Sequence, residues 1–189
     1  MKKCIKIRKL LVVMAATLAC TAGIMIESHA VQVVPQIGGY IAAEPEASSE
    51  GFKVEIIQPK FEAYTNANGF YRFNTDDRVA TQSICTFKIS KKGYLTRYIS
   101  NVPFNSYNIS IGTAKEPVSI LAGDVNSDDT INMNDIVLMA KAFNTTSTDN
   151  EFNEAADMNF DKSINMSDVV IIAKNFNKSS SDYGVPVIE

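Results

Sequence analysis

Residues 123–144 read GDVNSDDTINMNDIVLMAKAFN, and residues 156–177 read ADMNFDKSINMSDVVIIAKNFN. The two stretches are copies of one unit, offset by 33 residues, and twelve of the 22 aligned positions are identical. The identities fall on acids, amides and apolar residues in a fixed register, which is typical of an internal repeat. The sequence therefore predicts that one small structural unit occurs twice near the C-terminus.

Each unit opens with oxygen-bearing side chains at alternate positions. A hard dication such as Ca²⁺ takes six to eight oxygens at about 2.3–2.6 Å, and a calcium loop supplies them from positions 1, 3, 5, 7, 9 and 12. Position 7 gives a main-chain carbonyl, and position 12 gives a carboxylate, here Asp in place of the usual Glu. We predict two Ca²⁺ ions, whose ligands are Asp124, Asn126, Asp128, Thr130, Asn132 and Asp135 in the first loop and Asp157, Asn159, Asp161, Ser163, Asn165 and Asp168 in the second.

Loop position 6 departs from the usual pattern, in which Gly permits a sharp turn with positive φ. Asp129 and Lys162 stand there. Asp tolerates positive φ, whereas Lys should strain the second loop by roughly 1 kcal/mol. The alternative is two turns rich in Asp and Asn without any ion, but so many carboxylates placed so close together would repel one another.

A helix should follow each loop, because apolar residues recur with helical spacing. The stripe expected to face a shared core is Ile136, Met139, Ala140 and Phe143, repeated as Val169, Ile172, Ala173 and Phe176. The opposite flank is apolar too, and a module of this size with two helices cannot bury all of it. Such surface favours a partner site, although burial under the 145–155 linker or the preceding domain is the alternative. The predicted partner-binding residues are Met133, Asn134, Val137, Leu138, Lys141, Met166, Ser167, Val170, Ile171 and Lys174.

These paired loops, each followed directly by a helix with no helix in front, resemble a dockerin. Dockerins are calcium-dependent modules that bind a cohesin during cellulosome assembly, so the resemblance implies a cohesin partner. Type I dockerins carry a Ser/Thr pair at loop positions 10 and 11. Here those positions read Met133-Asn134 and Met166-Ser167, which is more similar to type II dockerins, modules that attach scaffolds to cell-surface cohesins.

The first thirty residues have the pattern of a signal peptide. A basic start is followed by the largely apolar stretch 10–25 and by Ser28-His29-Ala30, so cleavage is predicted after Ala30. A lipoprotein signal that uses Cys20 is the alternative, but Thr17 stands where such a signal has Leu. We expect a secreted, extracellular protein associated with a cellulosome or a cell surface.

Removal of the signal peptide would leave 13 Lys and Arg against 20 Asp and Glu, because the segment contains five of the 18 and one of the 21. The mature net charge is then −7, which argues against nucleic acid and anionic membrane as partners. Of the three Cys, only Cys85 would remain, so no disulfide could form within the mature chain. The C-terminal module would depend on calcium for its stability.

Residues 31–119 show a period of two, with the turn signal Asn66-Ala67-Asn68-Gly69 between two of about seven short candidate strands. This pattern predicts a small β-sandwich. Residues 38–41, 65–71 and 88–95 are similar to the X-module, an immunoglobulin-like or carboxypeptidase-regulatory-like domain that directly precedes type II dockerins. Because residues 112–122 are short and partly apolar, we expect the two domains to dock rigidly rather than swing on a tether.

The expected organisation is a signal peptide (1–30), a β-sandwich X-module-like domain (31–119), a dockerin domain (120–180) and a C-terminal tail (181–189). The predicted fold class is multidomain, an all-β sandwich followed by a small all-α dockerin with two EF-hand-like calcium loops. The predicted function is calcium-dependent cohesin binding that anchors or assembles a component of polysaccharide-degrading machinery. The sandwich would stabilise the dockerin and could contact the cohesin.

Two other functions can be weighed from the residues. The single His lies in the predicted signal peptide, which excludes His-based triads and zinc sites from the mature chain. Paired carboxylates for glycoside cleavage could come from Glu44, Glu46, Glu50, Glu55, Glu62, Asp76 and Asp77, but these fit solvent-facing positions better, so no catalysis is expected. The alternative is a carbohydrate-binding accessory protein with its aromatic platform drawn from Tyr40, Phe61, Tyr64, Phe70, Tyr71, Tyr94, Tyr98 and Tyr107.

Overall fold

The computed structural model describes residues 36–44, 47–74, 84–104 and 108–189, all of which belong to one unit spanning 34–189. The predicted signal peptide lies outside these residues, as do Glu46, Asp76, Asp77 and Tyr107. Within the described part of the chain, no helix is long and apolar enough to cross a membrane.

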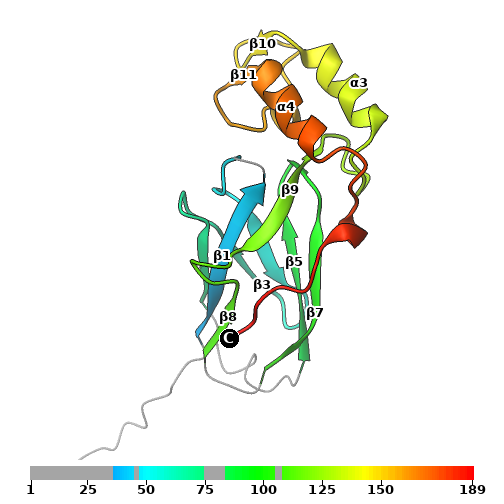
Figure 1. The fold of residues 1–189 in the computed structure, drawn as a ribbon. Coiled ribbons are helices and arrows are strands. Elements are labelled where there is room, and N and C mark those ends of the chain that lie inside the picture. Colours follow the sequence, from blue (N-terminus) through cyan, green and yellow to red (C-terminus); the bar gives the residue numbers. More distant parts are fainter. Residues whose placement is uncertain (1–35, 45–46, 75–83, 105–107) are drawn as a thin grey trace, which may run out of the picture. The chain divides into compact units, whose positions relative to one another are not determined.

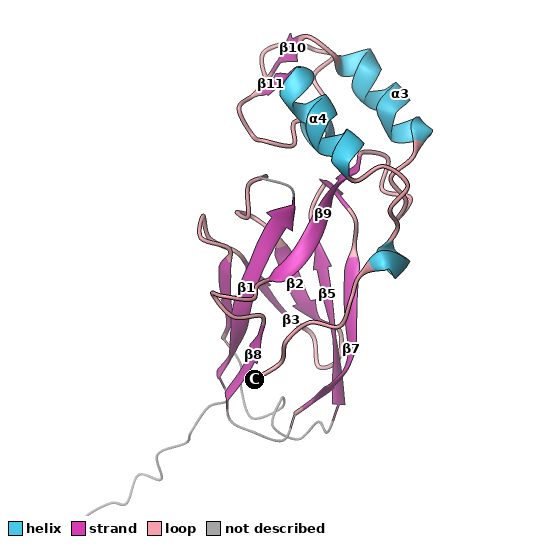
Figure 2. Ribbon diagram, viewed as in Figure 1, coloured by secondary structure: helices cyan, strands magenta, loops and turns pink. Residues whose placement is uncertain are grey.

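Among the described residues, nine strands precede the duplicated loops, and they belong to two sheets (Figure 1, Figure 2). In the first sheet β1 is central, pairing antiparallel with β4 and parallel with both β8 and β9, while β6 lies beyond β9. The second sheet has the order β3-β2-β5-β7 and is antiparallel. The strands are β1 (Gln36–Glu44), β2 (Lys53–Ile56), β3 (Phe61–Tyr64), β4 (Phe70–Phe73), β5 (Ile84–Ser90), β6 (Gly93–Tyr94), β7 (Arg97–Pro103), β8 (Asn108–Ile111) and β9 (Val118–Asp124).

The two sheets share a hydrophobic core because alternate residues of each strand point inward. Burial alternates along β1 and β5. Phe52, Phe87 and Ile120 have no exposed surface, and Tyr71 is 1% exposed. The described residues of this region thus form the predicted β-sandwich.

Strand β9 connects the sandwich to the duplicated loops without a linker. It begins at Val118 and ends at Asp124, the first predicted ligand of the first loop. The boundary predicted between residues 119 and 120 therefore falls inside a strand. Gly123 has φ of 135°, and a Cβ there would lie 2.9 Å from the side chain of Ile131 and 3.0 Å from that of Ile172. A residue without a side chain therefore allows the start of the first loop to pack closely against α4.

The prediction of an all-α C-terminal domain is wrong. The region has only two short α-helices, α3 (Met133–Ala142) and α4 (Met166–Lys174), and the rest is loop, turn and strand. Two-residue strands β10 (Thr145–Thr146) and β11 (Ser163–Ile164) pair antiparallel, and η1 (Glu154–Ala156) and η2 (Ser180–Asp182) are 3₁₀ turns. The helical content is low because position 9 of each loop is the N-cap, so nine loop residues precede each helix.

The helix starts follow from side chains that satisfy free main-chain N–H groups. The Asn132 side chain accepts hydrogen bonds from the N–H groups of Asn134 and Asp135, and the Asp135 side chain accepts one from the N–H of Asn132. The reciprocal bonds between Asn132 and Asp135 make a capping box. Asn165 and Asp168 repeat this arrangement at α4. The same residues that were predicted to bind the ion thus also begin the helices.

The predicted core stripe of the helices is only partly correct. Met139 is 1% exposed and Ile172 is fully buried, as expected. Phe143 and Phe176, however, are 43% and 38% exposed. Each Phe lies beyond the last helical turn, because α3 ends at Ala142 and α4 at Lys174. Ala140 and Ala173 lie inside the helices and are exposed as well, because the buried face includes Ala142 and Ile171 instead.

Candidate functional site

The first residue of each loop is a buried Asp around which the chain curls. Asp124 is 1% exposed, and its Oδ1 and Oδ2 accept hydrogen bonds from the N–H groups of Asp128 and Asp129, both at 3.0 Å. Asp157 is 5% exposed and accepts one from the N–H of Lys162 at 3.0 Å. Positions 1 and 6 are thereby held together in both loops.

The last residue of each loop is a fully buried Asp that ties the helix to the loop entrance. Asp135 Oδ1 accepts hydrogen bonds from the N–H groups of Val125 and Asn126, and its Oδ2 accepts from Asn132. Asp168 has the same set with the residues 33 positions later, Met158, Asn159 and Asn165. Three main-chain N–H groups therefore orient each carboxylate and leave further lone pairs available for a cation.

The intermediate positions form a chain of short-range hydrogen bonds. Asn126 Oδ1 accepts from the N–H of Asp128, and Asp128 Oδ1 accepts from the N–H of Thr130, both at 3.0 Å. The equivalent bonds in the second loop join Asn159, Asp161 and Ser163. The structure therefore brings the predicted ligands of each loop into one turn, with Thr130 and Ser163 half-buried at position 7.

The electrostatics of the loops favour a bound cation. Burial is the main reason why the pKa of Asp124 rises to about 6, and the nearby carboxylates of Asp135 and Asp128 raise it further against the hydrogen bonds that lower it. Burial likewise raises the pKa of Asp157, with Asp168 and Asp161 adding to the effect. The first loop has four carboxylates and the second has three, and a dication would offset this concentrated negative charge.

One buried oxygen has no hydrogen-bond partner in the described structure, and it is Asp157 Oδ1. Such a group is costly unless something binds it. Among the described residues, no three His, Cys, Asp or Glu side chains gather closely enough to hold a metal by themselves. Amide and main-chain oxygens would have to complete the shell, and that mixed oxygen set fits a hard cation such as Ca²⁺.

The repeat is longer than the 22 residues visible as sequence identity. Asn144 donates its N–H to Ile164 O and Ser147 donates to Lys162 O; 33 residues later, Asn177 donates to Ile131 O and Ser180 to Asp129 O. Each post-helix segment thus pairs with the loop of the other repeat.

A sequence motif marks this extension of the repeat, although the sequence analysis did not detect it. Thr146-x-x-Asp149 in the first repeat is matched by Ser179-x-x-Asp182 in the second. In each motif the Asp accepts hydrogen bonds from the hydroxyl and the N–H of the first residue, and these bonds lower the pKa of the Asp.

The predicted partner-binding residues fall on two equivalent helix faces. Met133 and Met166 are 61% and 62% exposed, and Val137 and Val170 are 48% and 47% exposed. Asn134, Lys141, Ser167 and Lys174 are also exposed, Leu138 is half-buried, and Ile171 is buried at 7% exposure. A groove of about 270 Å³, lined by Ile136, Met139, Ala140, Phe143 and Val169, lies between the helices.

The two repeats differ in their contacts with the sandwich. Asn175 near the end of α4 donates hydrogen bonds to the carbonyls of Glu44 and Ala122, whereas the equivalent residue in the first repeat is Ala142. The hydroxyl of Tyr94 donates to Met158 O, and Lys91 lies 3.8 Å from the ring centroid of Phe160. The second repeat therefore contacts the sandwich through the side chains of Asn175 and Phe160, where the first repeat has Ala142 and Ser127.

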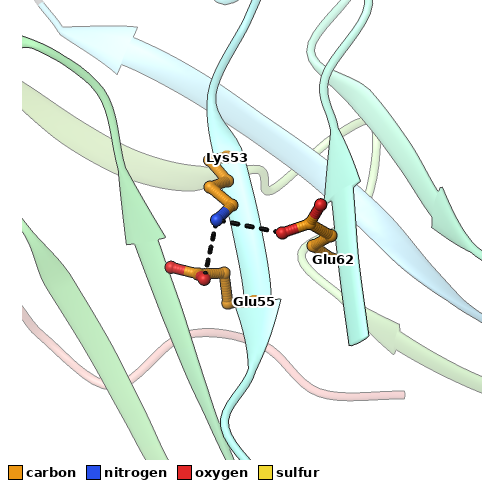
Figure 3. Close-up of polar contacts among 3 residues, drawn as sticks. All are labelled: Lys53, Glu55 and Glu62. Atoms are coloured by element: carbon orange, nitrogen blue, oxygen red, sulfur yellow. Dashed lines mark hydrogen bonds and ion pairs between the residues drawn. The ribbon is translucent and has the colours of Figure 1, made fainter. Parts of the chain in front are cut away.

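Two of the carboxylates considered for catalysis, Glu55 and Glu62, form ion pairs with one lysine. Lys53 lies 2.8 Å from Glu55 and 3.0 Å from Glu62, on adjacent strands β2 and β3 (Figure 3). The hydrogen bond from Lys53 is the main cause that lowers the pKa of Glu55. A general acid for glycoside cleavage needs a raised pKa, so the lowered pKa of Glu55 does not suit that role.

The candidate sugar-binding aromatics are divided between core and surface. Tyr71 and Tyr94 are buried at 1% and 3% exposure, and Tyr40 and Phe61 are half-buried. Tyr64, Tyr98 and Phe70 are exposed. Tyr64 and Tyr98 lie on opposite edge strands of the second sheet, β3 and β7.

Residues 122–177 match the family described as the Dockerin type I domain. Two solved structures with a TM-score of 0.67 are X-dockerin chains from type II cohesin–X-dockerin complexes of Acetivibrio cellulolyticus, an N-terminal and a C-terminal interface mutant. They are 35% and 36% identical to this chain, and each match covers 79% of this chain and 99% of the solved one. This chain belongs to the X-module–dockerin family.

The nine-stranded sandwich is accordingly the X-module, and the duplicated loops with α3 and α4 are the dockerin, which belongs to a calcium-binding family. Cellulosomal-scaffolding protein B of Acetivibrio thermocellus is 32% identical over 131 residues. That match covers 66% of this chain but 17% of the scaffolding protein, so the chain spans a small part of that relative's length.

Proposed function

We propose that this X-module–dockerin binds a cohesin through the exposed faces of α3 and α4, and so joins a secreted protein to a cellulosome or a cell surface. The observation that carries the proposal is the equal exposure of equivalent apolar residues, Met133 with Met166 and Val137 with Val170. A monomeric protein leaves such paired faces uncovered at a cost, and they fit a partner that covers them. Met suits such an interface because its flexible side chain repacks.

Two Ca²⁺ ions would hold this surface in shape, one in each loop. Asp124, Asn126, Asp128, Thr130, Asn132 and Asp135 would bind the first, and Asp157, Asn159, Asp161, Ser163, Asn165 and Asp168 the second. The ion would draw together carboxylates that otherwise repel, and Asp135 and Asp168 would transmit its position to the first turn of each helix. The support is the donor set and the unpartnered oxygen of Asp157.

A type II cohesin is the partner that the loop residues favour. Position 10 is Met in both loops, Met133 and Met166, so an apolar side chain stands where type I dockerins carry a hydroxyl, and only position 11 is polar, with Asn134 and Ser167. The groove between the helices is lined by apolar residues as well. We infer a non-catalytic role and a signal peptide at residues 1–30. The X-module would extend from residue 31 to the end of β9 at Asp124, and the dockerin from there to Asp182.

Calorimetric titration against a type I and a type II cohesin tests the proposal. We expect tight binding of the type II cohesin with calcium present, and weak or no binding of the type I cohesin. Tight binding of type I alone would reverse the assignment of type. Binding of neither would remove the proposed function.

A carbohydrate-binding role has one observation in its favour, the exposed rings of Tyr64 and Tyr98 on the second sheet. A pull-down on cellulose or xylan without cohesin separates the two functions. We expect the chain to stay in the supernatant. Retention that disappears in the Tyr64→Ala, Tyr98→Ala double variant would favour the carbohydrate-binding role instead.

A further inference from the structure

The two repeats diverge after the aspartates that end them, Asp149 and Asp182. The first repeat continues through η1 into the second loop, whereas the second continues as residues 183–189, which we name the C-terminal strap. The strap runs beside the sandwich to the edge of β8, where the chain ends (Figure 1). Its contacts are to the sandwich, although its preceding residues belong to the dockerin.

The strap begins with a tyrosine that bridges two strands of the X-module. The hydroxyl of Tyr183 accepts a hydrogen bond from the N–H of Leu121 at 3.0 Å and donates one to the carbonyl of Leu95 at 3.0 Å. Leu95 and Leu121 are themselves paired, since the N–H of Leu95 donates to Leu121 O at 2.9 Å. The tyrosine therefore closes the end of the β6–β9 pairing, and burial raises its pKa to about 12.

A buried arginine holds the next residue of the strap. Arg97 is 5% exposed and donates hydrogen bonds to Ser119 O at 2.7 Å and to Gly184 O at 2.6 Å. Its guanidinium lies 4.7 Å from the ring centroid of Tyr183. A buried guanidinium needs such partners, so the strap satisfies a charge that the X-module places under it.

The last residues of the strap add a strand to β8. Gly112 donates its N–H to Val187 O, and Ser110 and Glu189 exchange N–H to carbonyl hydrogen bonds at 2.8 and 2.9 Å. Ile188 faces Ile111 in an antiparallel bridge. The strap thereby occupies main-chain groups of an edge strand that would otherwise be open to another chain.

The residues just before the strap are paired with the first loop. Ser180 donates its N–H to Asp129 O and its hydroxyl to Thr96 O, and Lys178 O accepts the N–H of Ile131. Residues 178–189 therefore form one continuous segment, which pairs with Ile131 of the first loop at its start and with β8 at its end. We propose that the C-terminal strap fastens the first loop of the dockerin to the X-module, so that order in one supports order in the other.

Hydrogen exchange on the full mature chain tests this. Truncation after Asp182 should speed exchange of the Ser110, Gly112 and Leu121 amides at least tenfold. Glu189→Pro, which removes one donor, should speed exchange at Ser110 and Gly112, and Tyr183→Phe should speed it at Leu121.

Val185, which is 96% exposed within the strap, provides the control Val185→Ala, which should change none of these exchange rates. Unchanged exchange at all three amides in the three strap variants would overturn the proposal.

A second readout rests on the proposed calcium binding. Because Asp129 and Ile131 lie in the first loop, truncation after Asp182 should weaken calcium binding there about threefold or more and leave the second loop nearly unchanged. Equal affinities in truncated and intact chains would remove the coupling to the loop. If the intact chain binds no calcium, the proposed function fails, and the exchange rates still decide whether the strap is fastened.

Discussion

At the residue scale, Lys162 occupies a backbone conformation that suits Gly better. Its φ is 68°, in the left-handed region, and the equivalent Asp129 has φ of 64°. We predict that Lys162→Gly raises the free energy of unfolding by roughly 1 kcal/mol, because the Cβ strain disappears. Lys162→Ala removes the same charge and keeps the Cβ, so it should not stabilise. Denaturant unfolding measures both, and equal effects of the two variants would contradict the explanation.

Asn175 provides a second prediction at this scale. Its amide group donates to the carbonyls of Glu44 and Ala122, and the residue is 7% exposed. Asn175→Ala should lower the free energy of unfolding by roughly 1–3 kcal/mol, because two carbonyls lose their donor. Asn150→Ala, at an exposed loop position, is the matched control and should have almost no effect. Thermal unfolding that shows similar losses in both would count against this anchor.

Features of single residues could be predicted from the sequence where the same type of side chain recurs at a fixed spacing. The alternate oxygens and the turn at Asp129 and Lys162 could be found this way. Ser127 and Phe160 also have positive φ, at 61° and 60°, and this backbone conformation could not be predicted from those residue types. Their conformation follows from the curl of the loop around Asp124 and Asp157, which is a property of the whole turn.

At the scale of elements, the helix starts could be predicted and the helix ends could not. Asn132 and Asn165 cap their helices through side chains that are evident in the sequence. The helix ends depend on the return of the chain to pair with the other loop, at Asn144 with Ile164 and at Asn177 with Ile131. Those hydrogen bonds join main-chain groups far apart in sequence, so periodicity gave no signal for them and the helical stripe was extended too far.

The exposed helix faces give a prediction at this scale. Met133→Asp and Met166→Asp should each weaken cohesin binding at least tenfold if both faces are covered in the complex, because each places a charge in an apolar contact. Both residues are more than 60% exposed, so the unfolding midpoint should stay within a degree or two of the original. Lys178→Asp, at an exposed position beyond α4, is the control. Affinity unchanged in the double variant would exclude this face.

At the scale of the whole molecule, the sandwich and the docked arrangement were predictable in outline. Alternating burial in β1 and β5 follows directly from the sequence. The route of β9 into Asp124 and the strap along β8 were not, since residues 112–122 read as a short linker and residues 181–189 as a tail. Both depend on pairing between main-chain groups distant in the sequence, which composition does not encode.

Calcium removal should act unevenly across the molecule. Excess EGTA should reduce the helical circular dichroism signal, because the charges of each loop repel without a cation. The strand amides of the X-module that lie away from the strap should stay protected, because most residues of the shared hydrophobic core belong to the sandwich. Addition of calcium should restore the helical signal. A helical signal indifferent to EGTA would contradict the role given to the loops.

The most direct measurement is the affinity for a type II cohesin at saturating calcium and in excess EGTA on the same sample. Our account predicts tight binding with calcium, loss of at least a hundredfold in affinity with EGTA, and recovery when calcium is restored, because the ions hold α3 and α4 in place for docking. Equal affinity in calcium and in EGTA would contradict it.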